Sequence, residues 1–300
     1  MQAERTGVTY GGQTVEHARV EPSLAVVTVS YFSQDALSEL IESLADSELL
    51  PAETIVVDNA SDGELELPPM NGLEVVAAPA NLGYGGGINL GVKRLPPSID
   101  WVLITNPDVR VEASALATLL DVARDQTDAG TVGPRILESS GEVYPSAREL
   151  PSLRTGVGHA LFANLWLGNP WTRRYRGEGR VTSGQWRETG WLSGSCLLVR
   201  REAFEAIGGF DESYFMYFED VDLGARLTTA GWRNLYVPDA VVTHAGAHST
   251  SGTRAAAMRR EHHRSAYLYL SRKYSAWYLW PLRAGLRVAL QLRARVTRKG

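Results

Sequence analysis

The sequence contains one cysteine, Cys196, which excludes an internal disulfide bond. It also lacks an uninterrupted apolar run of about 18 residues, the minimum for a helix that crosses a bilayer. A basic and apolar leader of the secretory type is missing from its first residues. These absences predict a chain that works in the reducing cytoplasm. The apolar share of 44% and the charged share of 21% are ordinary for a globular chain. A length of 300 residues suits one α/β domain with additions.

Acidic residues are scarce at one end of the chain. Residues 254–300 contain 12 Lys and Arg but a single acid, Glu261, and so carry a charge of +11. Residues 1–253 contain the other 18 basic and 33 acidic residues and carry −15. This division predicts that residues 254–300 meet an anionic surface that the rest of the chain avoids.

Residues 254–300 also show helical periodicity, interrupted at Pro281. Aromatic and leucine side chains recur at helical spacing before the proline, and an apolar stripe with arginines opposite follows it. A basic amphipathic helix with Trp and Tyr is typical of a segment that lies in a membrane interface. We therefore expect a peripheral protein on the inner face of the plasma membrane. Packing of this segment on the body or on a second copy of the chain, in a homo-oligomer, is the alternative. A nucleic-acid partner is disfavoured because the body is acidic.

From residue 24 onward, short apolar strands alternate with helical segments, a pattern that predicts βαβ units and a mainly parallel sheet flanked by helices. We expect a polar N-terminal arm over 1–22, one catalytic domain over 23–253, and an irregular insertion or lid within it over 139–188. The expected strands are 24–32, 53–61, 73–80, 100–108 and 234–244, with helices in 35–47 and 113–125.

Polar side chains stand where the predicted strands end. Tyr31, Asp58, Asn59 and Asp108 all hold such positions, and ligands of open α/β sheets gather beyond the carboxyl ends of the strands. This convergence predicts a nucleotide-type site. Taken singly, Asp58 is as well explained by an Asx turn or a helix cap.

A glycine cluster over 81–95, "NLGYGGGINLGVKRL", is expected to form a loop that opens a helix. Such a loop can cradle phosphates at a helix N-terminus. The cluster matches neither a P-loop nor a dinucleotide fingerprint, so a flexible loop with tight turns is an equal alternative.

The stretch "TNPDV" at 105–109 places a carboxylate, Asp108, behind a rigid proline. Hard cations such as Mg²⁺ and Mn²⁺ take few protein carboxylates together with substrate phosphates. His244, at the end of the last predicted strand, could share the cation, since imidazole suits Mn²⁺, and His248 is its competitor. A turn in which Asp108 caps the next helix is the alternative.

Three acids, Glu219, Asp220 and Asp222, fall within four residues at a predicted helix start. The helix dipole explains one acid in a first turn without any function. The aromatic neighbours in "YFMYF" can raise a carboxyl pKa toward neutrality, as a general base requires.

Together these stretches resemble the inverting glycosyltransferases of family 2 with the GT-A fold, and among them the rhamnosyltransferases. The resemblance covers about residues 24–250. It is carried by "VVTVSYFS", "IVVDNASDG", "NLGYGGGINLG", "LITNPDV", "GWLSGSCLLVRREAFEAIGGFDESYFMYFEDVDLGARL" and "VVTHAGAHS".

The resemblance implies a nucleotide-sugar donor, a lipid-linked sugar acceptor, and Mn²⁺ or Mg²⁺ as cofactor. It implies that Asp220 is the catalytic base and that Asp108, with His244, binds the metal. Asn106 stands where the family often has a first metal-binding acid, so the metal role rests chiefly on Asp108. The substrate-binding residues implied are Tyr31, Asp58, Asn59, Asn81, Gly83, Asn89, Asn106, Trp191, Gly194 and Glu219.

Three alternatives stay open at this point. The donor could be another nucleotide sugar used in polysaccharide assembly. A nucleotidyltransferase would also use metal carboxylates on an α/β sheet, but it needs no base at Asp220. A membrane-surface binding protein would need neither Asp108 nor Asp220.

Overall fold

The computed structural model describes residues 9–10, 13–14, 19–60, 63, 65–152, 185–246 and 253–296. Most of the expected lid, from 153 to 184, and His248 therefore lie outside the described residues.

Within the described residues, ten strands form one sheet, in which β11, β14, β8, β13, β6, β3, β4 and β5 follow one another, β7 pairs with β14 and β9 with β8. Two small antiparallel pairs, β1 with β2 and β10 with β12, lie outside it. The strands are β1 (Thr9–Tyr10), β2 (Gln13–Thr14), β3 (Arg19–Ser30), β4 (Leu49–Asp58), β5 (Leu73–Ala77), β6 (Trp101–Thr105), β7 (Val109–Val111), β8 (Ala129–Glu138), β9 (Val143–Tyr144), β10 (Ala147–Arg148), β11 (Arg187–Thr189), β12 (Trp191–Leu192), β13 (Cys196–Arg200) and β14 (Arg233–His244).

The sheet is mixed. β3 runs parallel to β4 and β6, β4 runs parallel to β5, and β8 runs parallel to β14. β13 joins the two parallel groups because it pairs antiparallel with both β6 and β8. The predicted α/β class with a mainly parallel sheet is confirmed.

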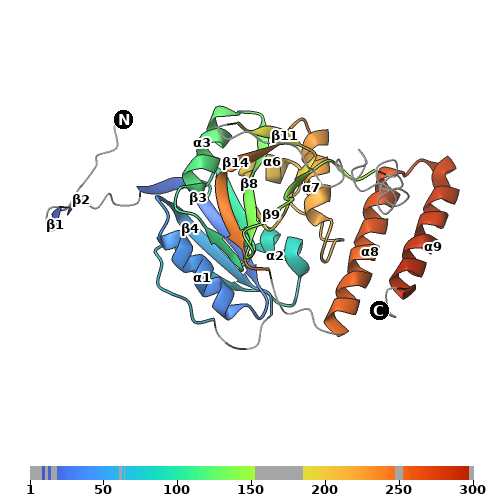
Figure 1. Ribbon diagram of the computed structural model, residues 1–300, viewed down its shortest axis with the longest axis horizontal. Helices are drawn as coiled ribbons and strands as arrows, with labels where there is room; N and C mark the ends of the chain where they lie inside the picture. The colour runs from blue at the N-terminus through green and yellow to red at the C-terminus, as the bar shows by residue number, and fades with distance from the viewer. Residues whose placement is uncertain are drawn as a thin grey trace.

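Helices cover both faces of the sheet (Figure 1). They are α1 (Gln34–Ala45), α2 (Gly83–Val92), α3 (Ala115–Asp125), α6 (Arg201–Ala206), α7 (Glu219–Thr229), α8 (Thr253–Lys273), the 3₁₀ helix η1 (Trp277–Leu279) and α9 (Trp280–Val296). Successive residues of a strand point to opposite faces. In β3, Leu24 and Val26 pack with α1 and α3, whereas Ala25 and Val27 pack with α2, α6 and α7. Both faces of the central strands are therefore buried, which explains their continuous apolar runs.

Two strands begin earlier than predicted. β3 starts at Arg19 rather than residue 24, and β4 at Leu49 rather than 53, because the two pair in parallel from Arg19 and Leu49 onward. This extension was not predicted because it contains an acidic residue, Glu21, which would ordinarily be exposed. Its carboxylate is buried and meets the guanidinium of Arg124, 2.9 Å away on α3. The partner of this buried acid lies far along the chain, so the residues around Glu21 predict only a polar arm.

The glycine cluster, predicted as a loop that opens a helix, contains the helix, but the helix takes in nearly all of the glycines. The structure places Gly83 to Gly91 inside α2. A Cβ at Gly87 would lie 2.7 Å from Val29 Cγ2, and one at Gly91 would lie 2.5 Å from Val27 Cγ1, both closer than real contacts. The glycines thus let α2 lie directly on the sheet.

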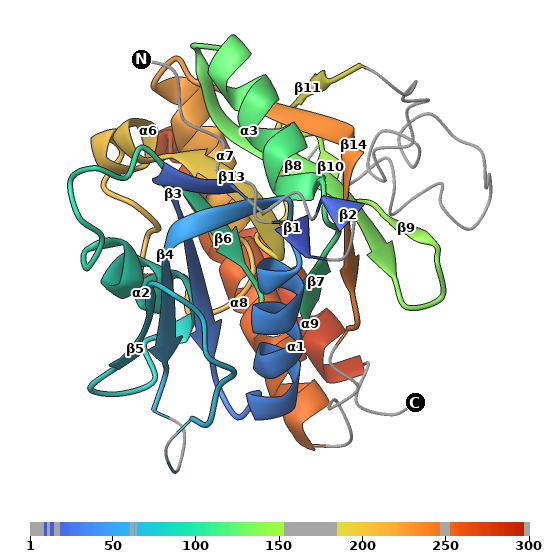
Figure 2. The same ribbon diagram turned by 90° about the vertical axis from the view of Figure 1, so that its left-hand side faces the viewer.

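α8 and α9 form a pair beside the domain, beyond α7 (Figures 1 and 2). α8 lies against the segment that precedes α7, where Ser265 Oγ donates to the Met216 carbonyl. Pro281 stands near the start of α9 after η1, as its sequence position predicts. Among the described residues, none of the helices combines the length and apolar character needed to cross a bilayer.

Candidate active site

The carboxyl ends of β3 and β4 present Tyr31 and Asp58 side by side at one edge of the sheet. Asp58 is the last residue of β4 and pairs in register with Ser30, the last residue of β3. Tyr31 follows Ser30, is 50% exposed, and packs edge-on against Phe32. Both predicted nucleotide contacts therefore stand at the solvent edge of the sheet.

Asn59 and Asn81 hold the start of α2. Asn59 Oδ1 accepts from the Leu82 N–H at 2.8 Å, and Asn59 Nδ2 donates to Asn81 Oδ1 at 3.0 Å. Asn81 Oδ1 also accepts from the Gly83 N–H at 3.0 Å. The structure thus gives these three residues a role in fixing the chain between β4 and α2. Their predicted contact with substrate stays a prediction.

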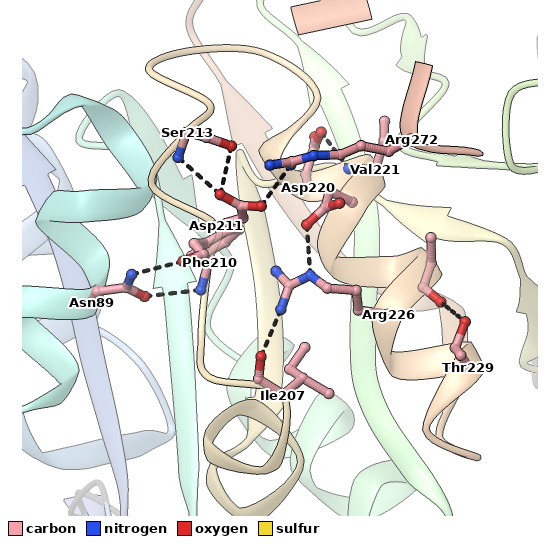
Figure 3. A network of polar contacts seen from close by, with 12 residues as sticks. Asn89, Ile207, Phe210, Asp211, Ser213, Asp220, Val221, Arg226, Thr229 and Arg272 are labelled. Carbon is pink, nitrogen blue, oxygen red and sulfur yellow. Dashed lines mark hydrogen bonds and ion pairs between the residues drawn. The ribbon is translucent and has the colours of Figure 1, made fainter. Parts of the chain in front are cut away.

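Asn89 is buried and reaches from α2 to the segment after α6 (Figure 3). Its carboxamide accepts from the Phe210 N–H and donates to the Phe210 carbonyl, both at 2.9 Å. Arg272 of α8 binds the neighbouring Asp211 at 2.6 Å. The segment that leads to Asp220 is therefore held from two sides, and Asn89 acts there as a structural clamp.

Asp108, His244 and Asn106 converge at the ends of β6 and β14. Asp108 Oδ1 lies 3.0 Å from His244 Nε2, and Asn106 Nδ2 lies 3.3 Å from the same nitrogen. The pairing of β7 with β14, with Val109 opposite His244, brings the two sequence-distant residues together. The side chains of Asp108 and His244 are only 15% and 21% exposed.

This donor set suits a divalent cation that keeps most of its ligands for substrate and water. Two ligands on neighbouring vertices of an octahedron, about 2.1 Å from the ion, lie about 3.0 Å apart. The Asp108 oxygen and the His244 nitrogen have that separation. The described residues contain no group of three Asp, Glu, His or Cys side chains able to hold a metal. A cation here would consequently depend on a bound diphosphate for further ligands.

Glu219 and Asp220 begin α7, directly after a strained turn. Tyr217 and Phe218 both have positive φ angles, 68° and 67°, which are unfavourable for bulky side chains. Asp220 Oδ2 accepts from the Gly194 N–H at 3.0 Å, and Asp220 Oδ1 accepts from the Val221 N–H at 2.8 Å. The turn and these two bonds fix the carboxylate, a rigidity that suits a catalytic group.

Burial raises the pKa of both carboxyl groups. The pKa of Glu219 rises to about 8, chiefly through desolvation and then through the charge of Asp220. Desolvation also raises the pKa of Asp220, although the Gly194 and Val221 N–H groups and the charge of Arg148 act in the opposite direction. Neither acid forms a salt bridge with a described residue, and Glu219 Oε2 has no hydrogen-bond partner there. The third acid, Asp222, differs because Arg226 binds it at 2.6 Å.

A short turn at 193–195 connects the two groups of acids. The Asn106 N–H and the Thr105 hydroxyl both donate to the Ser195 carbonyl, at 2.8 and 3.2 Å. The preceding residue, Gly194, binds Asp220. This turn therefore binds Asn106, which lies beside Asp108 and His244, and also binds Asp220.

Trp191 lies two residues before this turn and is buried, and its predicted contact with substrate stays a prediction. It is 8% exposed and packs with Tyr214, Val221 and Tyr269, while its indole N–H donates to the Glu149 carbonyl at 3.2 Å. The contribution of α8 to this cluster, through Tyr269, was missed in the sequence. The helical spacing of the aromatic residues was interpreted as a membrane interface, with packing on the body as the alternative, and Tyr269 packs on the body.

A family model described as "Glycosyltransferase like family 2" matches residues 22–267. The N-acetylglucosaminyl-diphospho-decaprenol L-rhamnosyltransferase of Mycobacterium tuberculosis is 44% identical over 283 residues, which cover 90% of this chain and 91% of that protein. A rhamnosyltransferase of Escherichia coli is 29% identical over 257 residues, covering 83% of this chain and 92% of that protein.

Solved structures share the fold at low identity. A mannosyltransferase from Pyrobaculum calidifontis, in complex with GDP-Man and Mn²⁺, superposes with a TM-score of 0.54 and 16% identity, covering 91% of this chain and 71% of that one. TarS of S. aureus superposes with a TM-score of 0.51 and 16% identity, covering 81% of this chain and 64% of that one.

Proposed function

The chain belongs to glycosyltransferase family 2, and from this premise we propose that it transfers L-rhamnose from dTDP-L-rhamnose to N-acetylglucosamine on a polyprenyl diphosphate. The product would serve cell-wall linker assembly. The relative of known activity that matches nine tenths of this chain supports this choice of sugar and acceptor. The observation that carries the mechanism is that the turn at 193–195 binds both Asp220 and Asn106, and Asn106 shares His244 with Asp108.

On the donor side, Asp58 and Tyr31 would receive the nucleotide at the ends of β4 and β3. A carboxylate there can accept a hydrogen bond from the base imide, and an exposed ring can stack on the base. Asp108 and His244, with Asn106 beside them, would hold a divalent cation on the diphosphate. When bound, that cation supplies Lewis-acid stabilisation of the charge on the leaving group.

On the acceptor side, Asp220 would take the proton of the attacking hydroxyl group. Its raised pKa makes it a stronger base than an exposed aspartate, and the Gly194 and Val221 N–H groups hold it in one orientation. A single displacement then forms the new glycosidic bond at the anomeric carbon and breaks the bond to the diphosphate. The configuration of that carbon inverts, and Asp220 carries the proton away.

Peripheral attachment to the cytoplasmic face of the plasma membrane would bring the enzyme to its lipid-linked acceptor. Trp277, Tyr278 and Trp280 are 82%, 64% and 63% exposed at the junction of α8 and α9. Residues 254–300 carry the +11 charge that anionic headgroups attract. Aromatic side chains beside basic ones suit the interface between headgroups and acyl chains.

The reaction is tested with purified protein, Mn²⁺, dTDP-L-rhamnose and a short-chain N-acetylglucosaminyl-diphospho-polyprenol, with the product identified by mass spectrometry. We expect addition of one deoxyhexose. Parallel reactions with GDP-mannose and UDP-glucose test the donor, and transfer from one of these alone would contradict rhamnose. Release of pyrophosphate would instead indicate a nucleotidyltransferase.

The membrane attachment is tested by sedimentation with phosphatidylglycerol vesicles. The double variant Trp277→Ser, Trp280→Ser should bind several-fold more weakly than the parent chain, while Trp186→Ser, at an exposed position in another region, should bind normally. Unchanged binding of the double variant would rule out this anchor.

A further inference from the structure

We propose that Tyr84 is a positioning residue for Asp220, which it controls through the backbone of Gly194. This inference rests on the proposed function, because it assigns Tyr84 to the same proton transfer. Tyr84 belongs to the glycine cluster in α2. The close packing of α2 on the sheet explains why the cluster has glycines, but it does not explain why it has a tyrosine.

The contact runs through both backbone groups of one glycine. The Tyr84 hydroxyl donates to the Gly194 carbonyl at 2.5 Å, and the Gly194 N–H donates to Asp220 Oδ2 at 3.0 Å. Glycine has two nearly unrestricted backbone dihedrals, so an unanchored Gly194 could turn its N–H away from the carboxylate. The tyrosine hydroxyl holds the carbonyl on one side of the residue, and this narrows the orientations that the N–H can take.

The same three residues are also in close packing contact. A Cβ on Gly194 would lie 3.3 Å from Tyr84 Cε1 and 3.5 Å from Asp220 Cβ. Gly194 is therefore enclosed between the tyrosine ring and the aspartate. A methyl group at 194 would press on the tyrosine ring by a few tenths of an ångström and would be in ordinary contact with the aspartate, so the three residues are also coupled by packing.

Tyr84 is itself firmly held. Its N–H donates to the Phe215 carbonyl at 3.2 Å, and its ring packs edge-on against Phe210 at 6.1 Å. Asn89 on the same helix clamps Phe210. The ring is thus part of the rigid contact between α2 and the segment that leads to α7, and its hydroxyl has a defined place.

The surroundings keep the hydroxyl protonated. Burial raises the pKa of Tyr84 well above its ordinary value, and the charges of Glu219, Asp220, Cys196 and Asp108 act in the same direction. A hydroxyl that keeps its proton remains a donor to Gly194 throughout the pH range in which Asp220 titrates.

Tyr84→Phe tests the proposal because it removes only the hydroxyl. We expect kcat to fall about tenfold, the scale of a lost hydrogen bond in a charged network, with KM for both substrates within about twofold. The acidic limb of the kcat profile should move to higher pH, because a carboxylate held less firmly by an N–H has a higher pKa. Tyr236→Phe in β14 is the matched control and should leave the profile unchanged.

A double-mutant cycle separates positioning from direct contact with substrate. In the Asp220→Asn background, Tyr84→Phe should change the residual rate by less than about twofold, because its effect requires the carboxylate. An equal loss in both backgrounds, or a loss in KM alone, would overturn the proposal. The melting temperature of each variant checks its folding.

Gly194→Ala is a second variant that tests the proposal. It should shift the acidic limb of the kcat profile in the same direction as Tyr84→Phe, and an unmoved limb in both variants would also overturn the proposal. Full activity of Asp220→Asn would instead contradict the proposed function itself.

Discussion

The two ends of the candidate site use the same kind of side chain in opposite environments. Asp108 lies 3.0 Å from an imidazole at a partly exposed edge of the sheet. Asp220 is half-buried, as Asp108 is, but it lies beside a second acid, the buried Glu219, and desolvation raises the pKa values of both. A carboxylate beside an imidazole suits ion binding, whereas one that forms no salt bridge with a described residue and has a raised pKa suits proton transfer. The environment, and not the residue type, therefore assigns the two roles.

The largest effect should come from removing the base. Asp220→Asn keeps the size of the side chain and its oxygen for the Gly194 N–H, but it cannot accept the proton. We expect kcat to fall about 100- to 10,000-fold. Asp121→Asn, at an exposed position on α3, is the matched control and should retain full activity. A fully active Asp220→Asn enzyme would assign the base to another residue.

Removing divalent cations should affect the Asp108 end alone. Dialysis against EDTA should lower the transfer rate at least about 100-fold, because the leaving diphosphate loses its charge stabilisation. Mn²⁺ or Mg²⁺ should restore the rate, and EDTA saturated beforehand with Mg²⁺ should have no effect. Undiminished transfer after dialysis would remove the metal role of Asp108 and His244.

A smaller effect, on stability, should come from Glu219. Its pKa is raised from 4.5 to about 8, so its contribution to the free energy of unfolding is fully present below about pH 4.5 and is lost as pH rises through about 8. Glu219→Gln removes the ionisable group, and with it the loss of stability that its ionisation causes at high pH. Its melting temperature should equal that of the parent at pH 5 and exceed it by about 2–5 °C at pH 9.

Glu39→Gln, at an exposed position on α1, should show no such pH dependence. A Glu219→Gln protein that melts below the parent at pH 9 would show that the ionised carboxylate has a partner that stabilises it.

The sequence was sufficient to predict the elements that carry the site. The helix expected in 35–47, the last strand that ends at His244 and the acidic helix start at 219–222 are local patterns, and the structure agrees with each. The convergence of Asp108 with His244 also followed from the rule that ligands gather where parallel strands end.

Other features depend on partners far along the chain. Glu21 extends β3 because Arg124 compensates its charge, and α2 is a helix of glycines because Val27 and Val29 lie beneath it. The carboxamide of Asn89 binds Phe210, 121 residues later, while its predicted contact with substrate stays a prediction. Local propensity contains no information about such contacts, so neither the clamp nor the link from Tyr84 to Gly194 could be predicted.

The difference between the two ends is tested most directly by titrating dTDP-L-rhamnose, in the presence of Mn²⁺, into the parent protein, Asp108→Asn and Asp220→Asn in a calorimeter. We expect Asp220→Asn to bind the donor within about twofold of the parent, and Asp108→Asn to bind it at least about tenfold more weakly. Equal loss of donor affinity in the two variants would contradict the division of roles between Asp108 and Asp220.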